Sequence, residues 1–218
     1  MRLPLFIAGL IGLSLSNAAP GQSADRPTAG FVRVRLVTSA GPIVLALDAR
    51  HAPATTANFL AYVDDRRFDG IVFYRAARSR LAPKFGYIQG GIRTDPRRIL
   101  PPFPHEPTTR TGIHHLDGTI SMARRAEPNS AGGNFFITVG PMPSMDATAT
   151  APGYAAFGRV VAGMPVVKRI LAAPTQDGAF KGQMIVRPIT ILTARRLDGK
   201  PRPTGRVKSW LVKLPPKR

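Results

Sequence analysis

Apolar and basic residues alternate along residues 31–38, so that one face of this segment is apolar and the other is charged. A period of two residues is typical of a strand with one buried face. The turn sequence Ser-Ala-Gly-Pro follows at residues 39–42, and residues 43–47 are again apolar. The segment 31–48 therefore predicts a β-hairpin.

Two later segments carry apolar residues at helical spacing. The first begins at Pro53, because proline is favoured in the first turn of a helix, and we expect it to end before Gly70. The second is expected to open at Gly163. Their apolar stripes consist of Phe59, Leu60 and Val63 in the first helix and of Val166, Val167, Ile170 and Leu171 in the second.

Short apolar runs separated by turn residues predict several more strands. The chain of 218 residues contains 22 prolines and 21 glycines, which favours short strands and loops over long helices. The proline-rich stretch 93–115 has little apolar periodicity, and we predict a long loop there. The fold class is therefore mainly β, a closed β structure plugged by two helices. The further strands are expected at residues 71–75, 87–89, 119–123, 135–139, 155–161 and 189–193.

The first 18 residues are typical of a secretory signal peptide. Arg2 supplies a positive charge, the stretch 3–15 is apolar apart from Ser14, and small residues close it at 16–18. The competing interpretation is a membrane anchor, but a run of about 13 apolar residues is too short to span the bilayer as a helix. We therefore predict an exported protein, periplasmic or secreted, in which residues 19–30 form a linker.

Charge and cysteine content limit the partners and the chemistry. The chain has 31 Lys and Arg against 12 Asp and Glu, a formal charge of +19, and residues 199–218 form a basic, proline-containing tail. Such a balance attracts polyanions, and the tail predicts a contact with an anionic envelope surface. Nucleic acid is not expected, because aromatic residues do not interleave with the basic ones. Cysteine is absent, so thiolate chemistry and cysteine-ligated zinc are excluded.

Four short motifs occur in a fixed order over about 65 residues. They are Phe-Tyr-Arg at 73–75, Gln-Gly-Gly at 89–91, Gly-Thr-Ile-Ser-Met-Ala at 118–123 and Asn-Phe-Phe-Ile at 134–137. Phe-Gly-Arg-Val follows at 157–160. No single motif is specific, but the series resembles the catalytic face of cyclophilin-type peptidyl-prolyl cis-trans isomerases.

This resemblance covers residues 31–198 and implies an eight-stranded antiparallel barrel with a helix at each open end. It also implies acceleration of rotation about X–Pro bonds in folding proteins, with proline-containing polypeptides as partners, without metal or cofactor, and in a monomer. Rotation is slow because amide resonance gives a barrier of about 18–20 kcal/mol. In the twisted state the prolyl nitrogen regains a lone pair, and a donor aimed at it binds that state preferentially.

The resemblance assigns that donor to Arg75, whose guanidinium is permanently charged and rigid. It assigns the floor of the prolyl pocket to Phe136. Because neighbouring strand residues face opposite sides, Phe135 is expected to point into the barrel. The remaining substrate-binding positions that the resemblance implies are Phe73, Gln89, Met122, Ala123, Arg124, Asn134, Met145 and Tyr154.

The sequence departs from the family pattern in three places. Before Gln89 the pocket phenylalanine is displaced, and either Phe85 or Tyr87 must complete that wall. One extra residue precedes Phe136, which leaves open whether Arg124 or its neighbour enters the groove. Ser144 stands where many members carry tryptophan, the residue linked to binding of cyclosporin.

Other constellations carry little weight. The four histidines lack the spacing of a zinc motif, and there is no nucleophile elbow around a serine. Two hypotheses therefore remain. The first is an exported proline isomerase, and the second is a non-catalytic proline-peptide-binding or chaperone module on the same fold.

Overall fold

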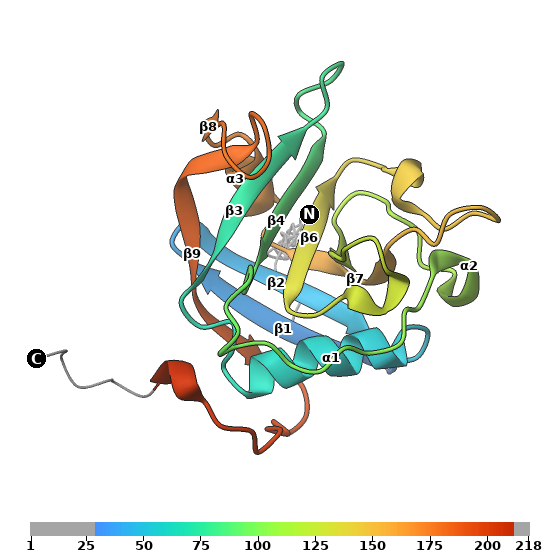
Figure 1. Ribbon diagram of the computed structural model, residues 1–218, viewed down its shortest axis with the longest axis vertical. Coiled ribbons are helices and arrows are strands. Elements are labelled where there is room, and N and C mark those ends of the chain that lie inside the picture. Colours follow the sequence, from blue (N-terminus) through green and yellow to red (C-terminus); the bar gives the residue numbers. More distant parts are fainter. Residues whose placement is uncertain (1–28, 212–218) are drawn as a thin grey trace, which may run out of the picture.

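Eight antiparallel strands close into a barrel in the computed structural model, which describes residues 29–211 (Figure 1). The order around the barrel is β1-β2-β7-β5-β6-β4-β3-β9, and the pairing of β1 with β9 closes it. The two-residue strand β8 pairs only with β9. The strands are β1 (Phe31–Thr38), β2 (Gly41–Asp48), β3 (Ile71–Arg78), β4 (Gly86–Gly91), β5 (Thr119–Met122), β6 (Asn134–Val139), β7 (Ala155–Ala162), β8 (Thr175–Gln176) and β9 (Met184–Arg196).

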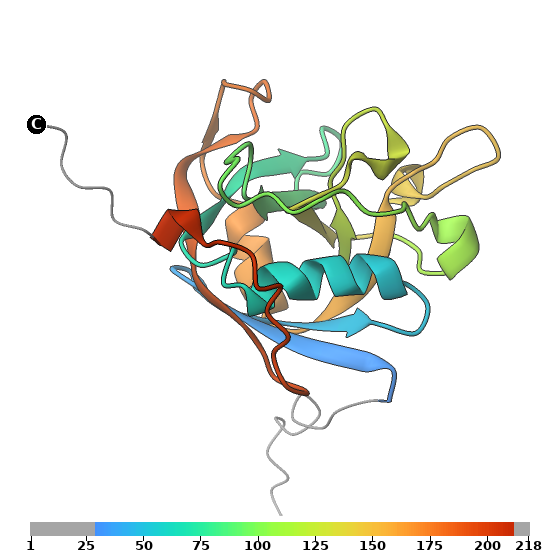
Figure 2. The same ribbon diagram turned by 60° about the horizontal axis from the view of Figure 1, so that its bottom comes forward.

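Helices α1 (Pro53–Asp64) and α3 (Met164–Leu171) cap the barrel, as the apolar stripes predicted. Helix α1 packs against β2, β7 and β9, whereas α3 packs against β2, β3, β4 and β6 (Figure 2). The loop predicted at 93–115 also contains a single helical turn, α2 (Thr108–Thr111), which has too few apolar residues to show in a periodicity. No helix within residues 29–211 is long and apolar enough to cross a membrane.

Aromatic rings fill the centre of the barrel. Phe59 of α1 lies with its ring centroid 4.9 Å from that of Phe68 and 5.3 Å from those of Phe135 and Phe157. All four side chains are fully buried. The inward orientation predicted for Phe135 is therefore confirmed, and the next residue along β6 faces the outside of the barrel.

The segment after β9 packs on the C-terminal end of α1, although the sequence predicted a tail outside the domain. The backbone amides of Arg202 and Thr204 donate hydrogen bonds to the carboxylates of Asp64 and Asp65, each at 2.8 Å. Trp210 lies against the guanidinium of Arg67, 4.5 Å from ring centroid to Cζ. The predicted leader, most of the linker and residues 212–218 lie outside the described part of the chain.

Candidate active site

A β-bulge in β3 turns Arg75 away from the core. Phe73 pairs with Gly90 and Arg75 pairs with Gln89, so the intervening Tyr74 is the extra residue. In a regular strand Arg75 would share the face of Phe73, which is buried in the barrel. The bulge shifts this alternation and brings Tyr74 and Arg75 together beside Gln89.

Three side chains hold the guanidinium of Arg75 in place. Its Nε donates to Oε1 of Gln183 at 2.7 Å, and its Nη1 donates to Oε1 of Gln89 at 3.0 Å. The ring of Phe180 covers the guanidinium, with 3.9 Å from the ring centroid to Cζ. These bonds use two of the five N–H donors of the arginine, so three remain for a substrate.

Gln89 connects Arg75 to Tyr74 through its amide. Its Nε2 donates to the Tyr74 hydroxyl at 2.9 Å, while its Oε1 accepts from Arg75. Burial raises the pKa of Tyr74 to about 12, so the hydroxyl stays protonated. That hydroxyl lies 3.4 Å from Oδ1 of Asn134, to which it can donate. This series of hydrogen bonds fixes the orientation of the Gln89 amide from both ends.

Phe136 forms an aromatic floor next to Arg75. Its ring centroid lies 5.3 Å from that of Tyr87 and 5.4 Å from that of Tyr154, which stands edge-on to it. Tyr87 also lies 5.1 Å from Cζ of Arg75. The backbone amide of Tyr154 donates to the carbonyl of Met145 at 3.0 Å, so these two residues are adjacent at the rim.

The structure distinguishes the two candidates for the remaining wall. Tyr87 contacts both Phe136 and Arg75, whereas Phe85 is 41% exposed. Both residues line a second recess. Ser144 lines the same recess as Phe85. Tyr87 is therefore the residue placed to complete the floor, and Phe85 flanks it.

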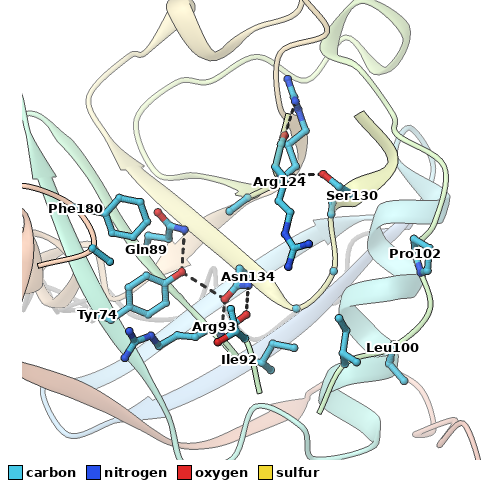
Figure 3. A pocket seen from close by; sticks show the side chains of 18 residues that line it. Tyr74, Gln89, Ile92, Arg93, Leu100, Pro102, Arg124, Ser130, Asn134 and Phe180 are labelled. Carbon is cyan, nitrogen blue, oxygen red and sulfur yellow. Dashed lines mark hydrogen bonds between the residues drawn. The ribbon is translucent and has the colours of Figure 1, made fainter. Parts of the chain in front are cut away.

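Beside this floor lies a cavity of about 480 Å³. Figure 3 shows Tyr74, Gln89 and Phe180 on one side of it and Leu100 and Pro102 on the opposite side. Ala123, Arg124 and Asn134, which the sequence assigned to substrate binding, also line the cavity. Arg124 itself is held by the loop around it, because its guanidinium donates to the carbonyls of Gly153, Arg125 and Ala126, each at 2.8 Å.

Two residues assigned to the substrate lie elsewhere. Phe73 and Met122 are 0% and 1% exposed and belong to the hydrophobic core. Phe73 precedes the bulge and packs on Phe135, with 5.8 Å between ring centroids. Met122 lies on the inner face of β5, like Ile120 two residues before it. Contrary to the prediction, neither side chain reaches the site surface.

A buried histidine supports the floor from below. The ring of His115 is stacked on Phe136 at 5.7 Å between centroids, its Nδ1 lies 2.5 Å from Asp146, and its Nε2 lies 2.9 Å from the hydroxyl of Ser121. Burial lowers the pKa of His115, although hydrogen bonding to Asp146 opposes that effect. Ser121 is fully buried, so this Ser-His-Asp arrangement offers no accessible nucleophile.

Four residues of the site were missed by sequence reasoning: Tyr74, Phe180, Gln183 and His115. Tyr74 adjoins Arg75, but only the bulge places it in the site. Phe180 and Gln183 lie more than 100 residues from Arg75 in a polar loop whose sequence has no periodicity. Within residues 29–211, no group of three His, Cys, Asp or Glu side chains is placed to hold a metal ion.

Comparison with known proteins identifies the family. The model for "Cyclophilin type peptidyl-prolyl cis-trans isomerase/CLD" matches residues 33–196, so the chain belongs to this family. It is 36% identical to peptidyl-prolyl cis-trans isomerase A of Dickeya dadantii over 183 residues, which cover 84% of this chain and 92% of the relative. It is also 36% identical to an isomerase of Streptomyces antibioticus, over 75% of this chain and 98% of that one.

Solved structures support the same fold. A cyclophilin of Cryptosporidium parvum superposes with a TM-score of 0.62 at 22% identity, covering 78% of this chain and 99% of that chain. A second structure of that protein, determined in the presence of the dipeptide Ala-Pro, gives a TM-score of 0.61. The eight-stranded barrel expected from the sequence is thus confirmed.

Proposed function

We propose that this protein is a peptidyl-prolyl cis-trans isomerase in which Arg75 donates a hydrogen bond to the prolyl nitrogen of the twisted amide. The observation that carries the proposal is the guanidinium itself, fixed by Gln89 and Gln183 and left with three free donors beside an aromatic floor. A donor fixed before the substrate arrives needs little rearrangement as the nitrogen lone pair develops. Because the planar amide nitrogen is a poor acceptor, the bond favours the transition state over both ground states.

The aromatic floor accounts for the specificity for proline. Phe136, Tyr87 and Tyr154 form an apolar surface on which a pyrrolidine ring can pack, with Met145 at its rim. Gln89 keeps one N–H of its amide for the client backbone after bonding to Tyr74. Holding the ring while the preceding carbonyl turns restricts the motion to the rotation that the reaction needs.

Catalysis can be tested with purified protein and short X–Pro peptides in a protease-coupled assay, without added metal or nucleotide. Acceleration of the cis-to-trans relaxation supports the proposal. Equal relaxation rates with and without the protein, for several residues before proline, would instead support the alternative, a proline-peptide-binding module that lacks turnover.

The leader sequence supports export as the setting of this activity. Residues 1–18 combine one early positive charge, an apolar stretch and small residues at the end, and clients would then be exported polypeptides. Amino-terminal sequencing of the protein recovered from the periplasm or medium tests this. A start after residue 18 supports export, and recovery of the intact leader in the cytosol contradicts it.

The basic tail supports a contact with an anionic surface. Lys200, Arg202 and Arg206 are exposed on the docked segment, and residues 199–218 contain no acidic residue. Each such cation near an anionic membrane contributes about 1 kcal/mol, reduced by salt. Sedimentation with anionic vesicles across a salt series, comparing the full chain with one ending at Asp198, tests this; equal sedimentation would refute it.

A further inference from the structure

The imidazole ring of His115 is stacked on Phe136, the floor of the prolyl pocket. The two ring planes differ by 11° and the centroids are 5.7 Å apart. Tyr87 and Tyr154 meet the same ring at 54° and 89°. His115 is 1% exposed, so it supports the floor from inside the protein, whereas the two tyrosines flank it. A change in the state of the histidine ring therefore acts directly on the floor.

Both ring nitrogens of His115 have a buried partner when the ring is neutral. Nδ1 lies 2.5 Å from Oδ1 of Asp146, and Nε2 lies 2.9 Å from Oγ of Ser121. Because an ionised carboxylate only accepts hydrogen bonds, Nδ1 carries the proton and donates it to Asp146. Nε2 then accepts from the hydroxyl of Ser121, which is 0% exposed. The neutral ring thus satisfies the serine, the carboxylate and itself.

A second proton on His115 disturbs this arrangement. Nε2 becomes a donor, so the bond to Ser121 has to reverse, and the serine hydroxyl has no other hydrogen-bond partner within residues 29–211. A buried donor without an acceptor is costly, and the charged ring also has to stay out of water. Burial lowers the pKa of His115 below its ordinary value of 6.5, and hydrogen bonding to Asp146 opposes this effect without outweighing it.

The charged groups around His115 are few. Asp146 faces Nδ1, and its second carboxylate oxygen lies 3.0 Å from Nδ1 of His114, whose side chain is 60% exposed. Within residues 29–211 these two histidines are the only ion-pair partners of Asp146. Asp117, two positions further along, accepts from the amide of Gly140 instead. The serine of β5 and the phenylalanine of β6 that contact the ring are uncharged, so Asp146 and His114 govern its charge state.

We infer that His115 is a positioning residue of the isomerase, whose neutral ring keeps Phe136 in place for the prolyl ring and whose protonation releases the floor. The inference rests on the proposed function and adds a dependence of client binding on pH. KM for proline peptides rises as the pH falls below 6.5, because the floor binds the client. The guanidinium of Arg75 is held by a separate set of hydrogen bonds, so kcat depends less on pH.

The test is the cis–trans exchange of a short Ala-Pro peptide, followed by exchange NMR spectroscopy between pH 7.5 and pH 5.0 without a coupling protease. For the natural chain we expect KM to rise by about threefold or more toward pH 5.0, with kcat within twofold. His115→Gln replaces the ring by an amide that can accept from Ser121 and donate to Asp146 but does not titrate. Its KM should be higher than that of the natural chain at pH 7.5 and should not change with pH.

Two further variants separate His115 from its neighbours. His114→Gln removes the exposed histidine on the same carboxylate and should keep the rise in KM. Asp146→Asn keeps an acceptor for Nδ1 but removes the negative charge that favours the protonated ring, so the rise should move to lower pH. A KM of the natural chain that is independent of pH, a rise that persists in His115→Gln, or a rise abolished by His114→Gln would overturn the inference.

Two measurements keep the inference separate from folding and from the proposed function. Near-UV circular dichroism at each pH shows whether a variant is folded; if His115→Gln is not, NMR titration of the His115 ring in the natural chain replaces it, and a midpoint that differs from that of the KM rise overturns the inference. If the natural chain accelerates no exchange at any pH, the proposed function fails, and fluorescence anisotropy of a labelled Ala-Pro peptide replaces kinetics. Binding that weakens at the midpoint of the His115 titration still supports the positioning role, and binding that is independent of pH overturns it.

Discussion

Gln183 accepts a hydrogen bond from Nε of Arg75 at 2.7 Å, although the two residues are 108 positions apart in the chain. The backbone carbonyl of Gln183 also accepts from the amide of Ala76 at 2.9 Å, which anchors its segment to β3. With Phe180 stacked on the guanidinium, the loop between β8 and β9 holds Nε of Arg75, while Gln89 of β4 holds its Nη1.

Removing this acceptor should loosen Arg75, the proposed hydrogen-bond donor. We expect Gln183→Met to lower kcat/KM by about threefold to tenfold, mainly through kcat, because the bond orients the donor and does not bind substrate. Gln183→Glu keeps an acceptor and should retain more activity than the methionine variant. Peptide kinetics and thermal melting of both variants check this, and unchanged kinetics in Gln183→Met would contradict the positioning role.

The guanidinium itself should be required. Arg75→Ala is expected to lower kcat/KM by at least tenfold, where each tenfold step corresponds to about 1.4 kcal/mol of transition-state stabilisation. Arg75→Lys should also be poor, because an ammonium lacks the planar fork that bonds Gln89 and Gln183 together. Arg75 is partly exposed, so melting temperatures should change little; full activity of Arg75→Ala would show that another group is the donor.

The fold could be predicted where side-chain periodicity reports burial. Alternation marked β1, and the stripe Val166, Val167, Ile170 and Leu171 marked α3, because in each case one buried face selects the pattern. The docked segment 199–211 could not be predicted, since it is held by backbone amides on Asp64 and Asp65 and by one stacked tryptophan. Such contacts leave no period in the sequence.

Sequence reasoning could predict only those site residues that belong to the ordered motifs. Arg75, Gln89 and Phe136 followed from the resemblance, and the structure brings them together. Assignment by motif alone misplaced Phe73 and Met122. Phe73 faces the core because it precedes the bulge in β3, and Met122 faces the core because it lies on the inner side of β5. Phe180 and Gln183 act through a loop contact that only the three-dimensional structure shows.

The exposed Ser144 predicts weak inhibition by cyclosporin. Its hydroxymethyl group lines the recess with Phe85 but offers neither the apolar surface nor the N–H donor of an indole. Ser144→Trp should therefore strengthen inhibition, measured as the cyclosporin concentration that halves the isomerisation rate. Tight inhibition of the natural chain that Ser144→Trp leaves unchanged would contradict this reasoning.

His115 should make stability depend on pH. Burial lowers its pKa in the folded state below the ordinary value of 6.5, so the unfolded chain binds more protons than the folded one as the pH falls below that value. The free energy of unfolding is then expected to decrease from pH 7 to pH 5. Burial raises the pKa of Asp146, but hydrogen bonds from His115 and His114 outweigh it and hold this pKa below the ordinary value of 3.8. The stability that the Asp146 carboxylate contributes is therefore lost only at still lower pH.

Urea unfolding at several pH values measures this dependence. His115→Gln should flatten the curve between pH 7 and pH 5, whereas His114→Gln, at an exposed histidine on the same carboxylate, should leave most of it. Because His115 supports Phe136, the first variant should also raise KM for proline peptides. If His115→Gln left the pH dependence of the unfolding free energy unchanged, other groups would be responsible for that dependence.

Docking of the C-terminal segment should contribute stability without contributing to catalysis. Trp210 covers the guanidinium of Arg67, whose side chain is 2% exposed and is paired with Asp65 at 2.9 Å. A cation–π contact and the partial burial of an indole together contribute about 1–2 kcal/mol.

Trp210→Ala should therefore lower the melting temperature by several degrees. Truncation after Asp198 should lower it further, because it also removes the amides bonded to Asp64 and Asp65. Truncation after Leu211 is the control and should melt like the full chain. The isomerisation rate of all three variants at 25 °C should stay within twofold of that of the full chain. A melting temperature unchanged by truncation after Asp198 would show that the docked segment does not stabilise the fold.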